Sequence, residues 1–104
     1  MDNAAIILTL NESLHLERCI LSIIPVFDKI YIVDSFSSDN TKDIANKYNA
    51  IFLEHNFINH SEQFNWSLNQ IDKQTNWILR IDADEYLTES LKTEISLNLN
   101  KLKN

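Results

Sequence analysis

The sequence contains no glycine, one proline and one cysteine in 104 residues. Without glycine it cannot form a Walker A loop or a glycine-rich dinucleotide fingerprint, because both need glycine where the backbone approaches phosphate closely. Its turns must use Asn, Asp, Ser or Pro, and asparagine tolerates left-handed positions. The lone Cys19 excludes an internal disulfide and is compatible with a reducing cytoplasm. It falls in an apolar helical pattern, where we expect it to be buried.

Basic residues and long hydrophobic runs are also scarce. Nine Lys and Arg stand against fifteen Asp and Glu, which gives a formal net charge of -6. Nucleic acid is therefore not expected as a partner, because neutralising its phosphates needs clustered Lys and Arg. The apolar stretches fall far short of the ~20 residues that cross a bilayer, and the N-terminus does not resemble a signal peptide. We expect a cytoplasmic chain, able to sit peripherally at the inner membrane face through a missing segment or a partner.

Strand and helix patterns alternate along the chain. Apolar and β-branched segments predict strands at 4–8, 29–33, 50–53 and 77–81, and amphipathic segments predict helices at about 14–24, 39–48, 61–71 and from 88 onward. Such alternation predicts one α/β domain over residues 1–104, with an open parallel sheet, helices on both faces and a Rossmann-like arrangement. Ligands of such sheets bind at the carboxyl ends of the strands.

The predicted core includes both tryptophans and one side of the last helix. Trp66 and Trp77 fit a packed interior better than a stacking platform. In the last helix, the spacing turns these positions inward: Leu91, Ile95 and Leu99 or Leu102.

Three of the predicted strands end in polar clusters. These are Thr9, Asn11 and Glu12 after the first strand, Asp34 and Ser35 after the second, and Asp82, Asp84 and Glu85 after the fourth. Carboxylates crowded at one sheet edge repel one another unless a cation or hydrogen-bond donors lie between them. Asp82 and Asp84 are separated by one residue, so in an extended segment both point to one side, where they could hold Mg²⁺ or Mn²⁺.

Each candidate also has an interpretation that involves no ligand. An isolated Asp-x-Asp is most often a pair of solvated loop charges, and its position after a buried strand is what favours a metal site. Asp34 could accept a hydrogen bond from a nucleobase or a ribose hydroxyl, or it could cap the backbone amides of Phe36 or Ser37. We expect Asp39 to cap a helix and His60 to lie at the surface, and the histidines lack the spacing of a zinc site.

Three segments, in this order, resemble the motifs of glycosyltransferase family 2, which has the GT-A fold. They are Thr9-Leu10-Asn11-Glu12, Ile32-Val33-Asp34-Ser35-Phe36-Ser37-Ser38-Asp39-Asn40-Thr41 and Trp77-Ile78-Leu79-Arg80-Ile81-Asp82-Ala83-Asp84-Glu85. Gln63-Phe64-Asn65 is similar to a Gln-x-Asn found in the branch of bacterial lipopolysaccharide-core and capsule sugar transferases. Each motif alone is weak, but three in order at matching strand ends are a strong signal, and the resemblance covers nearly the whole chain.

The resemblance implies a role for each candidate. Thr9 and Glu12 would line the nucleoside pocket, and Asp34 would hold the base, usually uracil. Asp82 would contact the sugar or ribose, and Asp84, with Asp82, would bind the Mn²⁺ or Mg²⁺ ion that bridges the diphosphate. The other expected members of the nucleotide-sugar site are Asn11, Ser35, Gln63 and Asn65.

The implied reaction is metal-dependent and inverting. A sugar would pass from a nucleotide-diphosphate donor, expected to be a UDP-sugar, to a hydroxyl of a glycan or lipid-linked acceptor in bacterial cell-envelope polysaccharide synthesis. Family members continue past Asp-x-Asp with the acceptor site and the catalytic base. We therefore expect this chain to be the N-terminal, donor-binding half of a GT-A fold, truncated before that region, with its catalytic base outside the chain. The face left by the missing strands favours a homo-oligomer.

Two residues depart from the family pattern, and two other functions stay open. Phe36 stands where Gly is common, and Phe64 stands where a basic residue that could contact phosphate is common. A non-catalytic remnant or interaction module could keep the same fold. An unrelated α/β phosphotransfer domain would place its nucleophilic Asp after the first strand, where this chain has Thr9 and Asn11.

Overall fold

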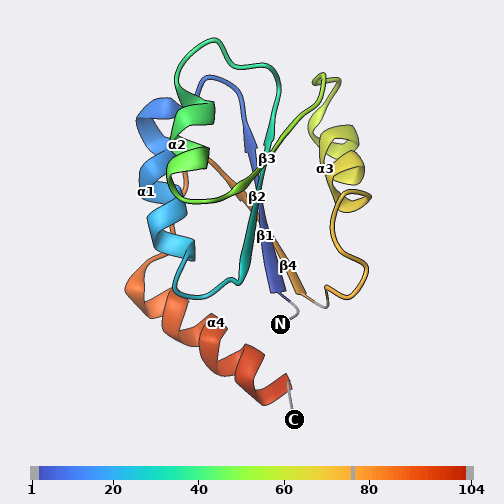
Figure 1. Cartoon of the computed structure of the whole chain (residues 1–104). Coiled ribbons are helices and arrows are strands. Elements are labelled where there is room, and N and C mark those ends of the chain that lie inside the picture. The colour runs from blue at the N-terminus through green and yellow to red at the C-terminus, as the bar shows by residue number, and fades with distance from the viewer. Residues whose placement is uncertain (1–2, 76, 103–104) are drawn as a thin grey trace.

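The computed structural model describes residues 3–75 and 77–102, with 99–102 as backbone only. Strands and helices alternate as predicted (Figure 1). In chain order the elements are β1 (Asn3–Thr9), α1 (Ser13–Ile23), β2 (Lys29–Asp34), α2 (Thr41–Lys47), β3 (Ile51–Glu54), α3 (His60–Leu68), β4 (Trp77–Asp82) and α4 (Glu89–Leu102). In the described part of the chain, no helix has both the length and the apolar character needed to cross a membrane.

The four strands form one parallel sheet in the order β3-β2-β1-β4. β1 has a strand on each side, and its residues 4–7 are completely buried. The register pairs Thr9 with Asp34 and Leu8 with Asp82, so β1, β2 and β4 end level with one another. The predicted open α/β sheet is confirmed, and its polar strand ends meet at one edge.

Helices cover both faces of the sheet, with α1, α2 and α4 on one side and α3 on the other (Figure 1). Because successive strand residues point to opposite faces, alternate residues of β1 serve the two layers. Ala5 and Ile7 pack with Leu16 and Ile20 of α1, whereas the intervening residues face the α3 layer. Each fully buried Leu or Ile in these layers stabilises the fold by about 1.5–3 kcal/mol.

Two side chains expected in the core lie at the surface. Trp77 is 47% exposed because, among the strands that the structure describes, β4 lies at the edge of the sheet beside β1 alone. Leu91 is 41% exposed although it lies in the first turn of α4, whereas Ile95, one turn further along the same helix, packs against the core as predicted. The expected burial of Leu99 or Leu102 falls on side chains outside the described part of the structure.

In the absence of glycine, two asparagines and one phenylalanine adopt positive φ angles. Asn11 and Asn49 adopt positive φ angles of 53° and 58°, as the tolerance of asparagine for this region predicts. Phe36 also has a positive φ, 59°, which is unusual for a bulky residue. This backbone angle gives a physical reason for the glycine that is common in the family at this position.

Candidate functional site

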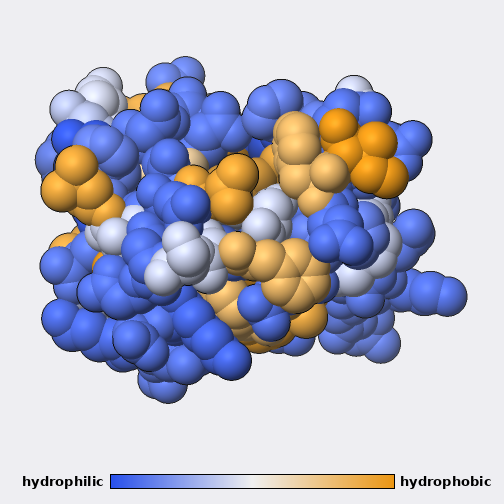
Figure 2. Space-filling view, turned by 90° about the horizontal axis from the view of Figure 1, so that it is seen from above, coloured by the Kyte–Doolittle hydropathy of each residue, from blue (hydrophilic) through white to orange (hydrophobic). Residues whose placement is uncertain are grey.

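A cavity of about 350 Å³ opens at the carboxyl edge of the sheet, beside α3. Figure 2 looks onto this edge and shows apolar patches set among mainly hydrophilic residues. The structure brings six predicted site residues together in the cavity lining: Thr9, Glu12, Ser35, Gln63, Asp82 and Asp84. The other three, Asn11, Asp34 and Asn65, do not line it.

A larger and more open hollow of about 570 Å³ lies between α1 and the start of α4. It contains none of the predicted site residues, and charged side chains in its lining form ion pairs within the protein. Lys92 pairs with Glu89 at 2.9 Å, and Glu17 pairs with Lys47 at 3.0 Å. The smaller cavity, with its strand-end carboxylates, is therefore the candidate site.

Asp34 lies beneath the cavity rather than in its wall. Its side chain is 1% exposed, and its carboxylate accepts hydrogen bonds from the Thr9 hydroxyl at 2.6 Å and from the Ser37 amide at 2.7 Å. The Ser37 hydroxyl donates a further bond at 2.5 Å. A buried carboxylate needs such donors to offset its lost hydration. Asp34 thus joins the ends of β1 and β2, and its contact with a base stays a prediction.

Asn11 joins the loop after β1 to the loop after β2. Its side-chain oxygen accepts a hydrogen bond from the Ser38 backbone amide at 2.8 Å. Its backbone amide donates to the Ser37 hydroxyl at 2.7 Å. Asn11 therefore supports the loops around the cavity from outside the lining.

Asp39 contacts the first residues of two helices, although the N-cap residues of α2 and α1 are Asn40 and Glu12. Its carboxylate accepts hydrogen bonds from the Thr41 amide at 3.0 Å and from the Ser13 amide at 3.1 Å. Thr41 begins α2 and Ser13 begins α1. Burial raises the pKa of Asp39, but the hydrogen bonds from Thr41 and Ser13 outweigh burial and lower it to about 2.

Gln63 is buried in the cavity wall, and its amide group is used within the protein. Its Oε1 lies 2.8 Å from Nδ1 of His55, and its Nε2 donates to the Ser35 hydroxyl at 3.2 Å. The His55 ring stacks on Trp66, with centroids 4.1 Å apart. Gln63 therefore fixes Ser35 at the cavity. Asn65 is exposed, because two residues along a helix turn a side chain by about 200°.

Glu12 contributes a buried carboxylate oxygen that has no partner. Its Oε2 accepts no hydrogen bond from the residues that the structure describes. Its backbone carbonyl starts α1 by accepting the amides of His15 and Leu16 at 3.0 and 2.9 Å. Leaving a buried polar group unsatisfied costs about 1–3 kcal/mol. The oxygen is thus available to an N–H or hydroxyl donor of a ligand.

Residues 82–85 form a tight acidic turn at the end of β4. The Glu85 amide donates to the Asp82 carbonyl at 2.9 Å, and the Glu85 carboxylate accepts from the Asp82 amide at 2.8 Å. The Arg80 guanidinium lies 3.9 Å from Oδ1 of Asp82. The Asp84 carboxylate is exposed and accepts no hydrogen bond from the described residues. Of the three acidic side chains, Asp84 is the one left free for a ligand.

Sequence reasoning did not select four of the residues that line the cavity: Leu8, Leu10, Phe57 and Ala83. Phe57 meets His60 edge to face, with ring centroids 5.2 Å apart, and both are exposed. The surface position predicted for His60 is confirmed, and His60 also lines the cavity. The available signal for Phe57 was its place in an irregular segment directly after a strand, where binding residues concentrate.

The sequence matches a family model described as "Glycosyl transferase family 2" over residues 4–99. The chain belongs to this family. The match confirms the predicted resemblance and excludes the alternative of a phosphotransfer domain.

Relatives in family 2 are considerably longer than this chain. An uncharacterized glycosyltransferase of Rickettsia bellii is 35% identical over 92 residues, which cover 88% of this chain and 31% of the relative. The SPbeta prophage-derived glycosyltransferase SunS of Bacillus subtilis is 30% identical over 92 residues, covering 86% of this chain and 22% of SunS. The chain thus spans about a third or less of the length of these relatives.

Solved structures share the fold. S. aureus TarS (residues 1–349) matches with a TM-score of 0.73 at 19% identity, covering 97% of this chain and 33% of TarS. Glucosyl-3-phosphoglycerate synthase of Mycobacterium tuberculosis was solved with Mn²⁺, uridine diphosphate and glucosyl-3-phosphoglycerate. It matches with a TM-score of 0.70 at 21% identity, covering 82% of this chain and 35% of the synthase. Both likenesses confirm the fold class.

The acidic turn fits a divalent cation that arrives together with a diphosphate. Among the residues described, no group of three or more His, Cys, Asp or Glu side chains is placed to hold a metal ion alone. Mg²⁺ and Mn²⁺ are commonly held by one or two carboxylates plus substrate phosphates. Asp84, with Asp82 beside it, provides such a set. The Arg80 guanidinium near Asp82 makes Asp84 the better candidate of the two.

Proposed function

We propose that the chain binds a nucleotide-diphosphate sugar in the cavity at the carboxyl edge, as the donor-binding part of a glycosyltransferase. The observation that carries this proposal is a pair of unengaged carboxylates in a family 2 chain. Glu12 has a buried oxygen without a partner, which suits a hydroxyl or N–H of the nucleoside. Asp84 is exposed and also lines the cavity, which suits a hydrated cation.

Uridine diphosphate is the nucleotide we propose. TarS has been solved with UDP and with UDP-GlcNAc, and the mycobacterial synthase with UDP and Mn²⁺. In this chain, Asp84 and Asp82 would hold Mn²⁺ or Mg²⁺, and Thr9 and Ser35 would border the nucleoside. The bound cation would neutralise negative charge on the leaving diphosphate.

We further propose that the sugar passes, with inversion, to a hydroxyl of a glycan or lipid-linked acceptor. The reaction needs a base for that hydroxyl. Asp34 is buried and accepts three hydrogen bonds, and Glu85 is bonded to the Asp82 amide, so neither is assigned as the base. We propose that the base corresponds to a residue in the part of the longer relatives that this chain does not cover.

We also propose that the chain self-associates through the open edge of β4. Trp77 and Ile78 on this strand are 47% and 38% exposed. An exposed strand edge with apolar side chains is a template for pairing with another chain.

The proposed donor site can be tested by thermal unfolding with Mn²⁺, UDP or both. We expect the combination to raise Tm by several degrees and either component alone to raise it less, since a ligand at 100 times its Kd stabilises a protein by about 2.7 kcal/mol. Asp84→Asn should abolish the increment that requires metal. Asp72→Asn is the matched control, because this carboxylate pairs with Lys29 at the amino edge of the sheet.

Two outcomes would contradict the proposal. If neither UDP nor any nucleotide sugar shifts Tm with metal present, the donor-binding role is wrong and a non-catalytic remnant is favoured. If Asp84→Asn keeps the full metal-dependent increment, the metal role of Asp84 is wrong even though donor binding stands.

A further inference from the structure

The acidic turn at the cavity is held by Arg18 of α1, which does not itself line the cavity. The Arg18 guanidinium donates to the Asp84 carbonyl oxygen at 3.1 Å and lies over the Tyr86 ring, 4.4 Å from its centroid. A guanidinium next to several carboxylates usually pairs with one of them, because charge-assisted bonds are the stronger ones. Here it bonds to the backbone instead, so the Asp84 carboxylate remains free for a ligand.

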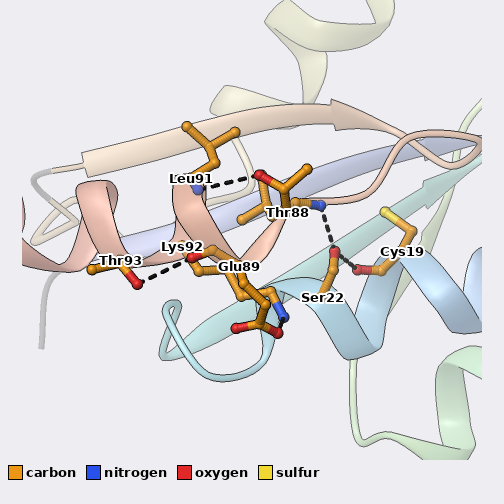
Figure 3. A network of polar contacts seen from close by, with 8 residues as sticks. Cys19, Ser22, Thr88, Glu89, Leu91, Lys92 and Thr93 are labelled. Carbon is orange, nitrogen blue, oxygen red and sulfur yellow. Dashed lines mark hydrogen bonds and ion pairs between the residues drawn. The ribbon is translucent and has the colours of Figure 1, made fainter.

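Two buried residues of α1 anchor the ends of the segment 82–87, which contains the acidic turn. The Cys19 thiol lies 3.7 Å from the Asp82 carbonyl. The Ser22 hydroxyl accepts from the Leu87 amide at 3.0 Å and donates to the Cys19 carbonyl at 2.7 Å (Figure 3).

Between these anchors, Asp84 is held by the exposed contact with Arg18. The segment contains no glycine, so its shape depends on hydrogen bonds rather than on an unusual backbone angle. Groups that orient a metal ligand from behind typically change metal affinity by 10–100-fold when removed. Arg18 bonds to the backbone of Asp84 and does not line the cavity.

We infer that Arg18 is a positioning residue for donor binding, which fixes the Asp84 backbone so that its carboxylate meets a cation bound with the diphosphate. This inference rests on the proposed function. It assigns Arg18 no contact with the nucleotide or the cation. Its removal should therefore weaken binding only where the cation takes part.

The test uses the whole 104-residue chain and calorimetric titration with UDP, with and without saturating Mn²⁺. In Arg18→Met, which keeps an apolar stem without the donor, we expect the Kd for UDP with Mn²⁺ to rise about tenfold. The Kd without metal should not change. Arg18→Lys, which keeps a donor and a cation near Tyr86, should recover part of the loss. Glu17→Gln is the control, because it removes the charge of the α1 carboxylate that contacts Lys47 and Tyr48, and Glu17 has no contact with the turn.

Amide hydrogen exchange gives a measurement that needs no ligand. The Glu85 amide, which closes the turn on the Asp82 carbonyl, should exchange faster in Arg18→Met than in the wild type or in Glu17→Gln. Unchanged exchange would overturn the positioning role.

The titrations of the wild type and of Arg18→Met distinguish a failure of this inference from a failure of the proposed function. Equal metal-dependent affinity for UDP in the wild type and in Arg18→Met would overturn the inference while leaving the proposed function intact. Failure of the wild type itself to bind UDP with Mn²⁺ would overturn the proposed function and, with it, the role of Arg18 in donor binding.

Discussion

Single polar residues of the site divide into those that the fold uses and those that it leaves for a ligand. The side chains of Asp34 and Gln63 form hydrogen bonds with other protein groups, with donor–acceptor distances between 2.5 and 3.3 Å. Glu12 and Asp84 keep carboxylate oxygens that accept no bond from the described residues. This division, rather than the identity of the residue type, marks the carboxylates that can recognise a ligand.

Glu12 should therefore lower the stability of the free chain and strengthen the binding of the nucleotide. In Glu12→Gln we expect the free energy of unfolding of the free chain to rise by up to about 1 kcal/mol, because a buried charge without a partner is replaced by a neutral group. The stabilisation by UDP with Mn²⁺ should fall at the same time. Urea unfolding with and without ligand measures both. A variant that is less stable than the wild type in the free state would show that Oε2 has a stabilising partner.

Residue types at this site could be predicted from the sequence, but their partners could not. Position after a strand was enough to select Thr9, Glu12 and Asp84. The bond between Thr9 and Asp34 joins residues 25 positions apart, and the bond between Arg18 and Asp84 joins residues 66 positions apart. Such pairings depend on how loops approach in space, which local sequence patterns do not encode.

Among the elements, α1 is the one that organises the site. Its first amide donates to Asp39 in the loop after β2, and its middle turns hold the acidic turn after β4 through Arg18, Cys19 and Ser22. The helix itself is fixed by buried residues such as Leu16 and Ile20. One helix thus sets the relative positions of the loop after β2 and the turn after β4.

Asp39 offers a pH test of this arrangement. Its folded pKa of about 2 lies below the ordinary value of 3.8, so its contribution is fully present above pH 3.8 and is lost as the pH falls towards 2. Asp39→Ala should lower the free energy of unfolding at pH 7 by about 1 kcal/mol, comparable to the usual effect of losing a helix cap. The difference from the wild type in urea unfolding should narrow between pH 3.8 and 2. A difference that stays constant over this range would contradict the role of the ionised carboxylate.

The strands and helices could be predicted almost completely from the sequence, because their periodicities are local. The errors have a shared cause. Trp77 was placed in the core because an apolar strand does not reveal whether it lies at the centre or the edge of a sheet. Leu91 was placed there because helical spacing puts Leu91 and Ile95 on one face of the helix but does not show which turns of that face the core covers.

For the whole molecule, the chain is compact although it spans about a third of its relatives' length. Its radius of gyration is 13.3 Å, close to the ~13 Å typical of a folded domain of about 100 residues. Two buried layers hold the sheet from both faces. Within the described residues, β4 pairs with β1 alone, so its other edge carries backbone groups without a strand partner (Figure 1).

This edge predicts concentration-dependent self-association. We expect light scattering with size-exclusion chromatography to show a dimer that dissociates on dilution. Ile78→Lys should shift the chain to monomer, because a charge on an edge strand opposes pairing with a second edge. Ile51→Lys is the matched control, since Ile51 is 40% exposed on β3, the opposite edge. A wild type that is monomeric at every concentration, or equal loss of the dimer in both variants, would show that β4 does not mediate association.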